Sequence, residues 1–290
     1  MSKLASAEEA LSVIQDGMTV GIGGWGPRRK PMALVRALLR SDVRDLTLVA
    51  YGGADVGLLC AAGKVKRVVF AFVSLDFMPL EPAFRLAREQ GAIEVTEVDE
   101  GMLLLGLRAA AWGCPFIPTA IGLGTDVIRN APQIKVVDSP YDDKEWVAMP
   151  ALNLDVALVH ATRADTSGVC EIASPDHYMD DWFVRAAKHS IVSVDELVER
   201  DYFHSAEVAR RVYWERNCTQ SVVLQPGGAH PSSSDPLYGF DPSHFKKYAE
   251  LIGEAGYSGW ADAYLGQDEA TYQRSVGGLD SIRALPLPVY

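Results

Sequence analysis

The glycine-rich segment at residues 16–31 constrains the fold more than any other stretch of the chain. Residues 18–22 are a short apolar run after an Asp-Gly turn, which predicts a strand. A loop follows it, made of Gly23, Gly24, Trp25 and Gly26, and then three cations, Arg28, Arg29 and Lys30. Pro31 suits the first turn of a helix, where its missing N–H would have no partner. Glycines let a ligand approach the backbone, so the loop predicts a site for an anion or a developing oxyanion.

Apolar runs alternate with helical spacing along the rest of the chain. The runs that predict further strands are residues 46–50, 68–73, 93–98, 116–120, 154–160 and 190–194. Helical spacing occupies residues 32–39, 82–90, 102–112 and 180–188. Continuous apolar strands between helices predict an α/β fold with an open, mostly parallel sheet and helices on both faces. Sites in such sheets lie beyond the carboxyl ends of the strands, where this chain has its glycine turns.

We expect one domain over residues 1–290. Prolines and acidic residues interrupt the pattern at residues 129–150, which predicts a loop or a small β excursion, and residues 240–290 predict a helical extension. The chain has 48% hydrophobic residues in 290, which is ordinary for a globular protein with a core.

Charge and composition exclude several classes of partner. The formal net charge is -11, whereas nucleic acids and anionic membranes require a basic face. No apolar run approaches the length of a membrane span, and the N-terminus has no signal-peptide core. The four cysteines are far apart and the six histidines lack ligand spacing. We therefore expect a cytoplasmic protein with reduced cysteines and no metal.

Two carboxylates are candidates for general-base chemistry. Glu97 and Glu100 stand at the end of the predicted strand at residues 93–98, and Glu100 lies furthest past it. A carboxylate in that place could activate water. The alternative is that these acids cap the following helix through its dipole. His160 and His230 are more simply explained as buried, hydrogen-bonded side chains.

Gly21, Gly23 and Gly26 formally match the dinucleotide-binding pattern G-x-G-x-x-G. In that pattern the third glycine lies inside a helix, but Pro27 and Pro31 keep Gly26 outside any helix. The second strand also ends in Tyr51, Gly52 and Gly53 instead of an acidic residue. These three residues could instead line an acyl pocket.

The same segment resembles the signature of family I CoA-transferase α subunits. The matching elements are Asp16-Gly17, an apolar stretch, Gly23-Gly24-Trp25 and Pro31. Gly21, Trp25 and Arg29 depart from it, where the family has an apolar residue, phenylalanine and glycine. Four further segments also fit, at residues 121–126, 155–161, 164–168 and 226–231, so that the resemblance spans about residues 16–231.

This resemblance implies a partner chain. In the family the glycine loop is an oxyanion or thioester-carbonyl site, and the nucleophilic glutamate belongs to a separate β subunit. This chain lacks the S-E-x-G type of segment that would carry that glutamate. We therefore expect a β subunit to complete the active site in an αβ or α2β2 assembly. No bound cofactor is expected, because the acyl-CoA substrate carries coenzyme A itself.

Trp25 followed by the three cations is similar to one branch of the family, which hydrolyses a ring C–C bond of a cyclohexenone-type CoA thioester in late steroid (cholesterol) degradation. The resemblance then implies that the backbone of residues 23–26 polarises a carbonyl and that Glu100 or Glu97 activates water. Arg28, Arg29 and Lys30 would attract the substrate carboxylate or the CoA phosphates. Two alternatives remain open: an α subunit of a CoA-transferase that acts on dicarboxylic acids, and a non-catalytic ligand-sensing module.

Overall fold

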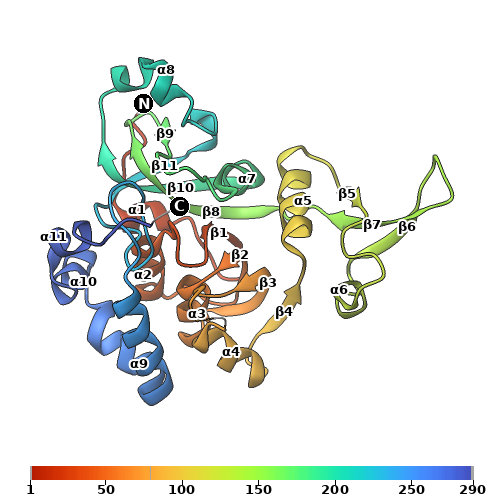
Figure 1. The fold of residues 1–290 in the computed structure, drawn as a ribbon, viewed down its shortest axis with the longest axis horizontal. Helices are drawn as coiled ribbons and strands as arrows, with labels where there is room; N and C mark the ends of the chain where they lie inside the picture. The colour runs from red at the N-terminus through yellow and green to blue at the C-terminus, as the bar shows by residue number, and fades with distance from the viewer. Residues whose placement is uncertain (1, 79, 289–290) are drawn as a thin grey trace.

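The computed structural model describes residues 2–78 and 80–288. Its main sheet has eight strands, in the order β11-β10-β8-β1-β2-β3-β4, with β9 beside β8 (Figure 1). The pairs are parallel except for β8–β9. The strands of this sheet are β1 (Thr19–Trp25), β2 (Leu46–Gly52), β3 (Val65–Val73), β4 (Glu94–Glu97), β8 (Leu154–Ala164), β9 (Cys170–Glu171), β10 (Ala187–Leu197) and β11 (Ser221–Leu224). The predicted open, mostly parallel α/β sheet is confirmed.

Successive residues of the central strands face two separate cores. In β2, Leu48 and Ala50 belong to one core, whereas Val49 and Tyr51 belong to the other. The first core includes side chains of α1 (Ala7–Leu11), α2 (Met32–Arg40), α3 (Ala54–Ala61), α4 (Pro82–Glu89) and α9 (Pro242–Trp260). The second includes side chains of α5 (Glu100–Ala111) and α7 (Asp180–Ala186). A strand covered on both faces has to be apolar throughout, which is why continuous runs predicted it.

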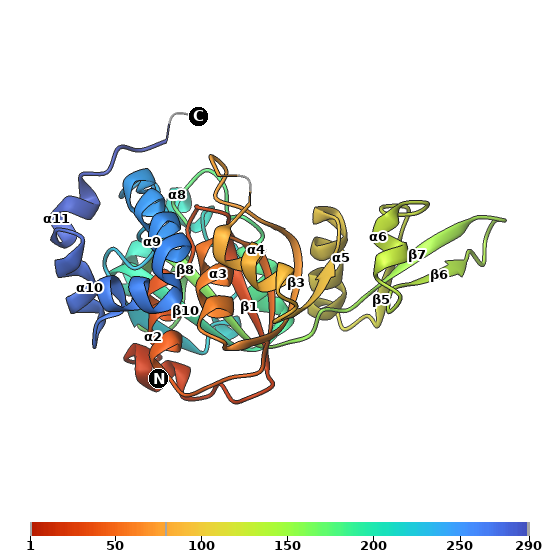
Figure 2. The ribbon, with the colours of Figure 1, turned by 90° about the horizontal axis from the view of Figure 1, so that it is seen from below.

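A second sheet projects from this body as an arm, defined here as residues 116–150 (Figures 1 and 2). It contains β5 (Phe116–Thr119), α6 (Asp126–Asn130), β6 (Lys135–Asp138) and β7 (Glu145–Pro150), with strand order β5-β7-β6. Its pairs are antiparallel. The prediction that residues 116–120 continue the parallel sheet is wrong, because β5 pairs with β7 of the excursion instead.

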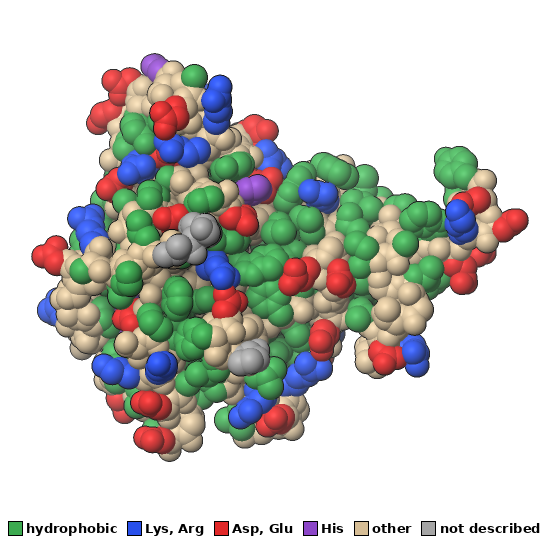
Figure 3. All heavy atoms as spheres, in the orientation of Figure 1, with side chains coloured by type: hydrophobic (Ala, Val, Ile, Leu, Met, Phe, Trp, Pro, Cys, Tyr) green, Lys and Arg blue, Asp and Glu red, His purple; other side chains and the backbone are tan. Residues whose placement is uncertain are grey.

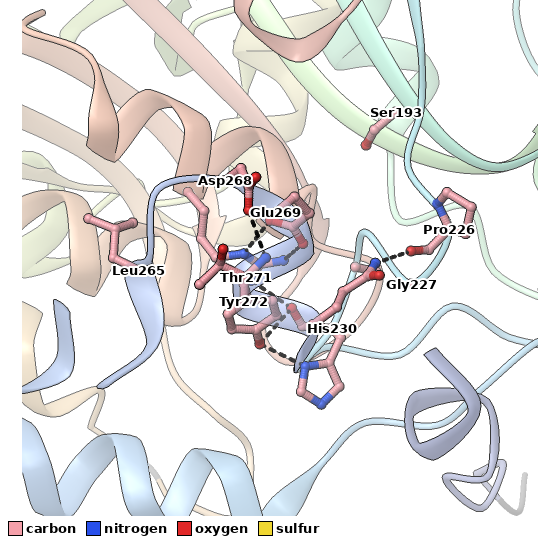
Figure 4. A network of polar contacts seen from close by, with 12 residues as sticks. Ser193, Pro226, Gly227, His230, Leu265, Asp268, Glu269, Thr271 and Tyr272 are labelled. Carbon is pink, nitrogen blue, oxygen red and sulfur yellow. Dashed lines mark hydrogen bonds and ion pairs between the residues drawn. The ribbon is translucent and has the colours of Figure 1, made fainter. Parts of the chain in front are cut away.

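The C-terminal part is helical, as predicted, although its last two positions lie outside the described residues. After α9 come a π-helical turn η3 (Ala261–Leu265), α10 (Glu269–Ser275) and α11 (Gly278–Arg283). Arg36 of α2 forms a buried ion pair with Glu269, and His230 Nδ1 lies 2.7 Å from the Tyr272 hydroxyl oxygen (Figure 4). These contacts attach α10 to the body.

Three short helices complete the described part of the chain: η1 (Arg200–His204), α8 (Ala206–Ala209) and η2 (Arg216–Cys218), all between β10 and β11. Among the described residues, no helix combines the length and the apolar character that crossing a bilayer requires.

Candidate active site

The glycine-rich loop at the end of β1 lies against the start of α7. A Cβ at Gly23 would lie 2.4 Å from Oδ1 of Asp180 and 2.6 Å from Cγ1 of Val159, so a larger residue would push α7 away. Gly24 has φ of +75°, which glycine adopts without strain. Its amide donates to Asp180 Oδ1 at 2.7 Å. A buried carboxylate that no sequence motif marks thus holds the loop.

The other amides of the loop are also paired within the chain. Trp25 N–H donates to the Arg28 carbonyl at 2.9 Å, and Gly26 N–H donates to the Tyr51 carbonyl at 3.3 Å. An oxyanion site needs donors that are free to face the substrate. In this arrangement the amides of Gly24, Trp25 and Gly26 are not free, so we correct the expectation that they polarise a carbonyl.

Two of the three cations point into the protein. Arg29 is 1% exposed and its guanidinium lies 3.0 Å from Asp180 Oδ2. Lys30 is also 1% exposed, and its Nζ lies 3.1 Å from Asp55 Oδ2. Burial lowers the pKa of Lys30, against the opposing effect of Asp55, and burial raises the pKa of Asp180, against Arg29. The expectation that Arg29 and Lys30 attract an anionic substrate is therefore corrected, because both charges are already neutralised.

Arg28 is the cation of this run that faces solvent. Its side chain is 36% exposed and pairs with Asp76 at 2.5 Å. It borders a cleft of about 610 Å³ whose other lining residues are Trp25, Pro175, Asp176, Tyr178 and Met179. This cleft offers an apolar wall with one cation and one carboxylate at its edge.

Tyr178 and Met179 form a wall of the cleft that the sequence patterns did not predict. They have φ of 47° and 61°, a conformation that costs about 1–3 kcal/mol for each such residue. The Arg29 guanidinium lies 4.8 Å from the centroid of the Tyr178 ring. The buried Arg29–Asp180 pair therefore supports both the loop and this wall. Neither residue of the turn is a glycine or an asparagine, so no local signal marks it.

Tyr51, Gly52 and Gly53 are buried behind the cleft and do not line it. Trp25 stacks on Tyr51 with ring centroids 4.7 Å apart. The Tyr51 hydroxyl donates to the carbonyl of Glu100 at 2.8 Å. This aromatic pair connects the cleft to the start of α5.

The two candidate acids have different surroundings. Glu97 is paired with Arg88 at 2.9 Å and is about half exposed. Glu100 is the first residue of α5, and no hydrogen-bond donor or cation within the described ranges pairs with its exposed carboxylate. Partial burial and the neighbouring Asp99 carboxylate raise the pKa of Glu100. Asp99 caps the helix by accepting from Gly101 N–H at 2.8 Å, so neither glutamate is needed for capping.

His160 belongs to a buried network that resembles a hydrolase triad in composition. Its Nδ1 lies 2.9 Å from Ser193 Oγ and its Nε2 lies 2.8 Å from Asp195 Oδ2. His160 and Ser193 are 0% exposed, and a nucleophile must reach its substrate. Asp195 also accepts from Gly227 N–H and Ser234 Oγ. The network therefore fixes the turn at residues 226–234, which also carries His230.

Residues that could hold a metal are not grouped. Within residues 2–78 and 80–288, no cluster of three or more His, Cys, Asp or Glu side chains is suited to a metal ion.

Comparison with known proteins gives consistent relatives. The family model described as Coenzyme A transferase matches residues 4–224. The Mycobacterium tuberculosis (strain ATCC 25618 / H37Rv) protein named cholesterol ring-cleaving hydrolase IpdA subunit is 43% identical over 289 residues, covering 97% of this chain and 99% of that protein.

Two solved structures are similar over most of the chain. The crystal structure of glutaconate coenzyme A-transferase from Acidaminococcus fermentans has a TM-score of 0.91 at 24% identity and covers 98% of this chain and 95% of its own. The crystal structure of a variant of the decarboxylase AibA/AibB has a TM-score of 0.79 at 29% identity and covers 90% of this chain and 98% of its own.

Proposed function

This chain belongs to the coenzyme A transferase family, and from that premise we propose that it is the α subunit of a C–C bond hydrolase that acts on a CoA thioester. The proposed reaction opens a ring of a cyclohexenone-type carboxyl-CoA thioester in late steroid (cholesterol) degradation. The observation that carries it is the 43% identity, over nearly the full length of both chains, to the relative named as a cholesterol ring-cleaving hydrolase subunit.

The unpaired Glu100 carboxylate is the proposed general base. It takes a proton from water, and the resulting hydroxide adds to a ring carbonyl carbon. The adjacent C–C bond then breaks, and its electron pair goes to the departing carbon, which takes up a proton from Glu100. The product gains one carboxylate and the CoA thioester stays intact. A base with a raised pKa is suited to both proton transfers, because it takes the proton from water more readily than an ordinary carboxylate does.

Arg28 is the proposed anchor for a carboxylate of the substrate. Its guanidinium borders the cleft and is partly exposed, so a substrate carboxylate can replace or join Asp76 as its partner. The apolar side chains of Trp25, Tyr178 and Met179 would pack against the ring system.

A β subunit completes the proposed enzyme. The cleft is open to solvent in this chain alone, and the relative that supports the proposal is itself named as a subunit. We propose an αβ or α2β2 assembly in the cytoplasm, with no resident cofactor, since coenzyme A arrives with the substrate.

Replacing Glu100 tests the proposal. In the reconstituted αβ enzyme, Glu100→Gln should lower kcat for ring opening by about 10²–10⁴-fold, the usual contribution of a positioned base. Glu97→Gln is the matched control and should keep near-normal turnover, because Arg88 already neutralises Glu97. Near-normal turnover of Glu100→Gln, with the fold unchanged, would exclude Glu100 as the base.

The alternative is a true CoA-transferase, which the 29% identity to a chain of the glutaconate CoA-transferase from Acidaminococcus fermentans keeps in view. Such an enzyme would exchange CoA with acetate or succinate through a glutamyl–CoA thioester on the β subunit. Treatment of the αβ enzyme with an acyl-CoA and borohydride would trap that thioester by reduction. A trapped adduct would replace the hydrolase proposal, and ring opening without an adduct would support it.

A further inference from the structure

The sheet of the arm is apolar on both faces. Pro118 lies opposite Ala148, and Val137 lies opposite Trp146, so these side chains share one face. The other face carries Ile117, Val147 and Met149. Val147 and Met149 are at most 1% exposed and belong to the core beneath α5. An antiparallel sheet with one face in a core usually has a polar second face, and this sheet does not.

The second face forms a groove of about 970 Å³. Its apolar lining includes Pro115, Phe116, Pro118, Val137, Tyr141 and Trp146. Phe116 is 42% exposed and Tyr141 is 95% exposed. Figure 3 shows hydrophobic side chains continuing from the body onto the arm. An exposed apolar area of this kind is typical of a protein interface.

The strands of the arm are poorly suited to pairing with a further strand. Pro118 in β5 has no backbone N–H to donate, and Pro132 and Pro140 flank β6. A partner is therefore expected to bind through side chains packed into the groove, not by extending the sheet at its edges.

The charge of the arm decides between a second copy and a different chain. Residues 138–145 at its tip contain four acids and one lysine, and the carboxylates of Asp138 and Asp142 border the groove. The whole chain carries a formal charge of -11. A second copy would bring more negative charge to this acidic tip, whereas a chain with Lys or Arg beside an apolar ridge would be attracted.

We propose that the groove of the arm is the docking surface for the β subunit, which inserts an apolar ridge flanked by Lys or Arg side chains next to Asp138 and Asp142. This inference rests on the proposed function, because it takes the partner to be the subunit that completes the active site.

Contacts between the arm and α5 explain why a partner at this place would affect Glu100. Leu152, just after β7, donates its N–H to the Gly106 carbonyl at 2.9 Å. A Cβ at Gly106 would lie 2.7 Å from Leu152 Cγ, and one at Gly101 would lie 2.7 Å from Ile121 Cδ1. Two glycines of α5 thus let the arm pack directly on the helix that begins with Glu100, so a subunit in the groove lies beside the candidate base.

Affinity measurements on the αβ pair test the proposal. Tyr141→Asp and Phe116→Asp should each weaken binding of the purified β subunit by about thirtyfold or more, the size expected for an interface hot spot. Asp142→Lys should slow association and reverse part of its salt dependence. The controls are Leu86→Asp, at a similarly exposed leucine on α4, and Glu254→Lys on α9, which should bind normally.

Light scattering and hydrogen exchange separate the possible outcomes. With the β subunit bound, the amides of β5, β6 and β7 should gain protection. A complex that forms with wild-type affinity in the arm variants would overturn this inference and leave the proposed function intact. Self-association of the chain alone that Tyr141→Asp abolishes would assign the groove to a second copy, and no complex with any β subunit would overturn both proposals.

Discussion

Asp180 and Asp55 are a matched pair of acids, each beside one buried cation of the loop. Each keeps a second role, because Oδ1 of Asp180 accepts from Gly24 N–H and Oδ1 of Asp55 accepts from Gly53 N–H, both at 2.7 Å. Substitution by Asn retains an oxygen for these amides and removes only the charge. The cations differ, since a buried lysine can lose its proton and an arginine cannot.

Asp180→Asn is therefore expected to destabilise the chain by about 3–5 kcal/mol, because it leaves Arg29 charged and unpaired in the interior. Asp55→Asn should cost less, since Lys30 can become neutral, and its cost should shrink further as pH rises. Urea unfolding at pH 7 and pH 9 measures both effects. Equal losses in the two variants at both pH values would contradict the assignment.

The start of α5 couples a helix cap to the candidate base. Asp99 both caps the helix and raises the pKa of Glu100. Asp99→Ala should cost about 0.5–2 kcal/mol of stability, as the loss of a cap does. Removing this carboxylate should also lower the pKa of Glu100, so the acidic limb of the pH profile of kcat/KM should move to lower pH.

Asp268→Ala provides the control for that prediction. Asp268 caps α10 by accepting from Thr271 N–H at 2.7 Å, away from the cleft. It should lose similar stability and keep the wild-type pH profile. A shift of the acidic limb in both variants, or in neither, would show that Asp99 does not act through Glu100.

At the scale of whole elements, the sequence predicted what local patterns determine. Strands with continuous apolar runs, such as residues 46–50, had to be covered on both faces, and the parallel sheet followed from that. Residues 116–120 have the same local pattern, but their pairing depends on β7, which comes much later in the chain. Arg29 and Lys30 looked exposed because their partners, Asp180 and Asp55, are distant in sequence and carry no motif.

The candidate site was predictable to a similar extent. The glycine loop and Glu100 do stand at the carboxyl ends of their strands, as strand ends and glycine turns indicated. The wall formed by Tyr178 and Met179 was not predictable, because nothing local in its sequence marks a left-handed turn.

Over the whole molecule, two buried acids connect the C-terminal helices to the body. Glu269 of α10 pairs with Arg36 of α2, and Glu81 before α4 accepts a hydrogen bond from Tyr248 of α9. Arg36 and Glu81 are 0% exposed. The two connections differ in charge, because Glu269 has a cationic partner and Glu81 has only hydrogen bonds from Tyr248 and the backbone of α4.

This difference predicts how the attachment of α9 responds to pH. Burial raises the pKa of Glu81 from 4.5 to about 7. Between these values the unfolded chain releases the proton and the folded chain keeps it, so the free energy of unfolding falls as pH rises through this window and levels off above pH 7. Glu81→Gln removes this loss and keeps an acceptor for Phe84 N–H, so relative to wild type it should gain about 3 kcal/mol between pH 4.5 and pH 8. Urea unfolding across that range measures the gain, with Glu89→Gln at an exposed position of α4 as the control that should follow wild type. A Glu81→Gln curve parallel to wild type would mean that Glu81 is already ionised in the folded chain, and that the contact between α4 and α9 is indifferent to pH.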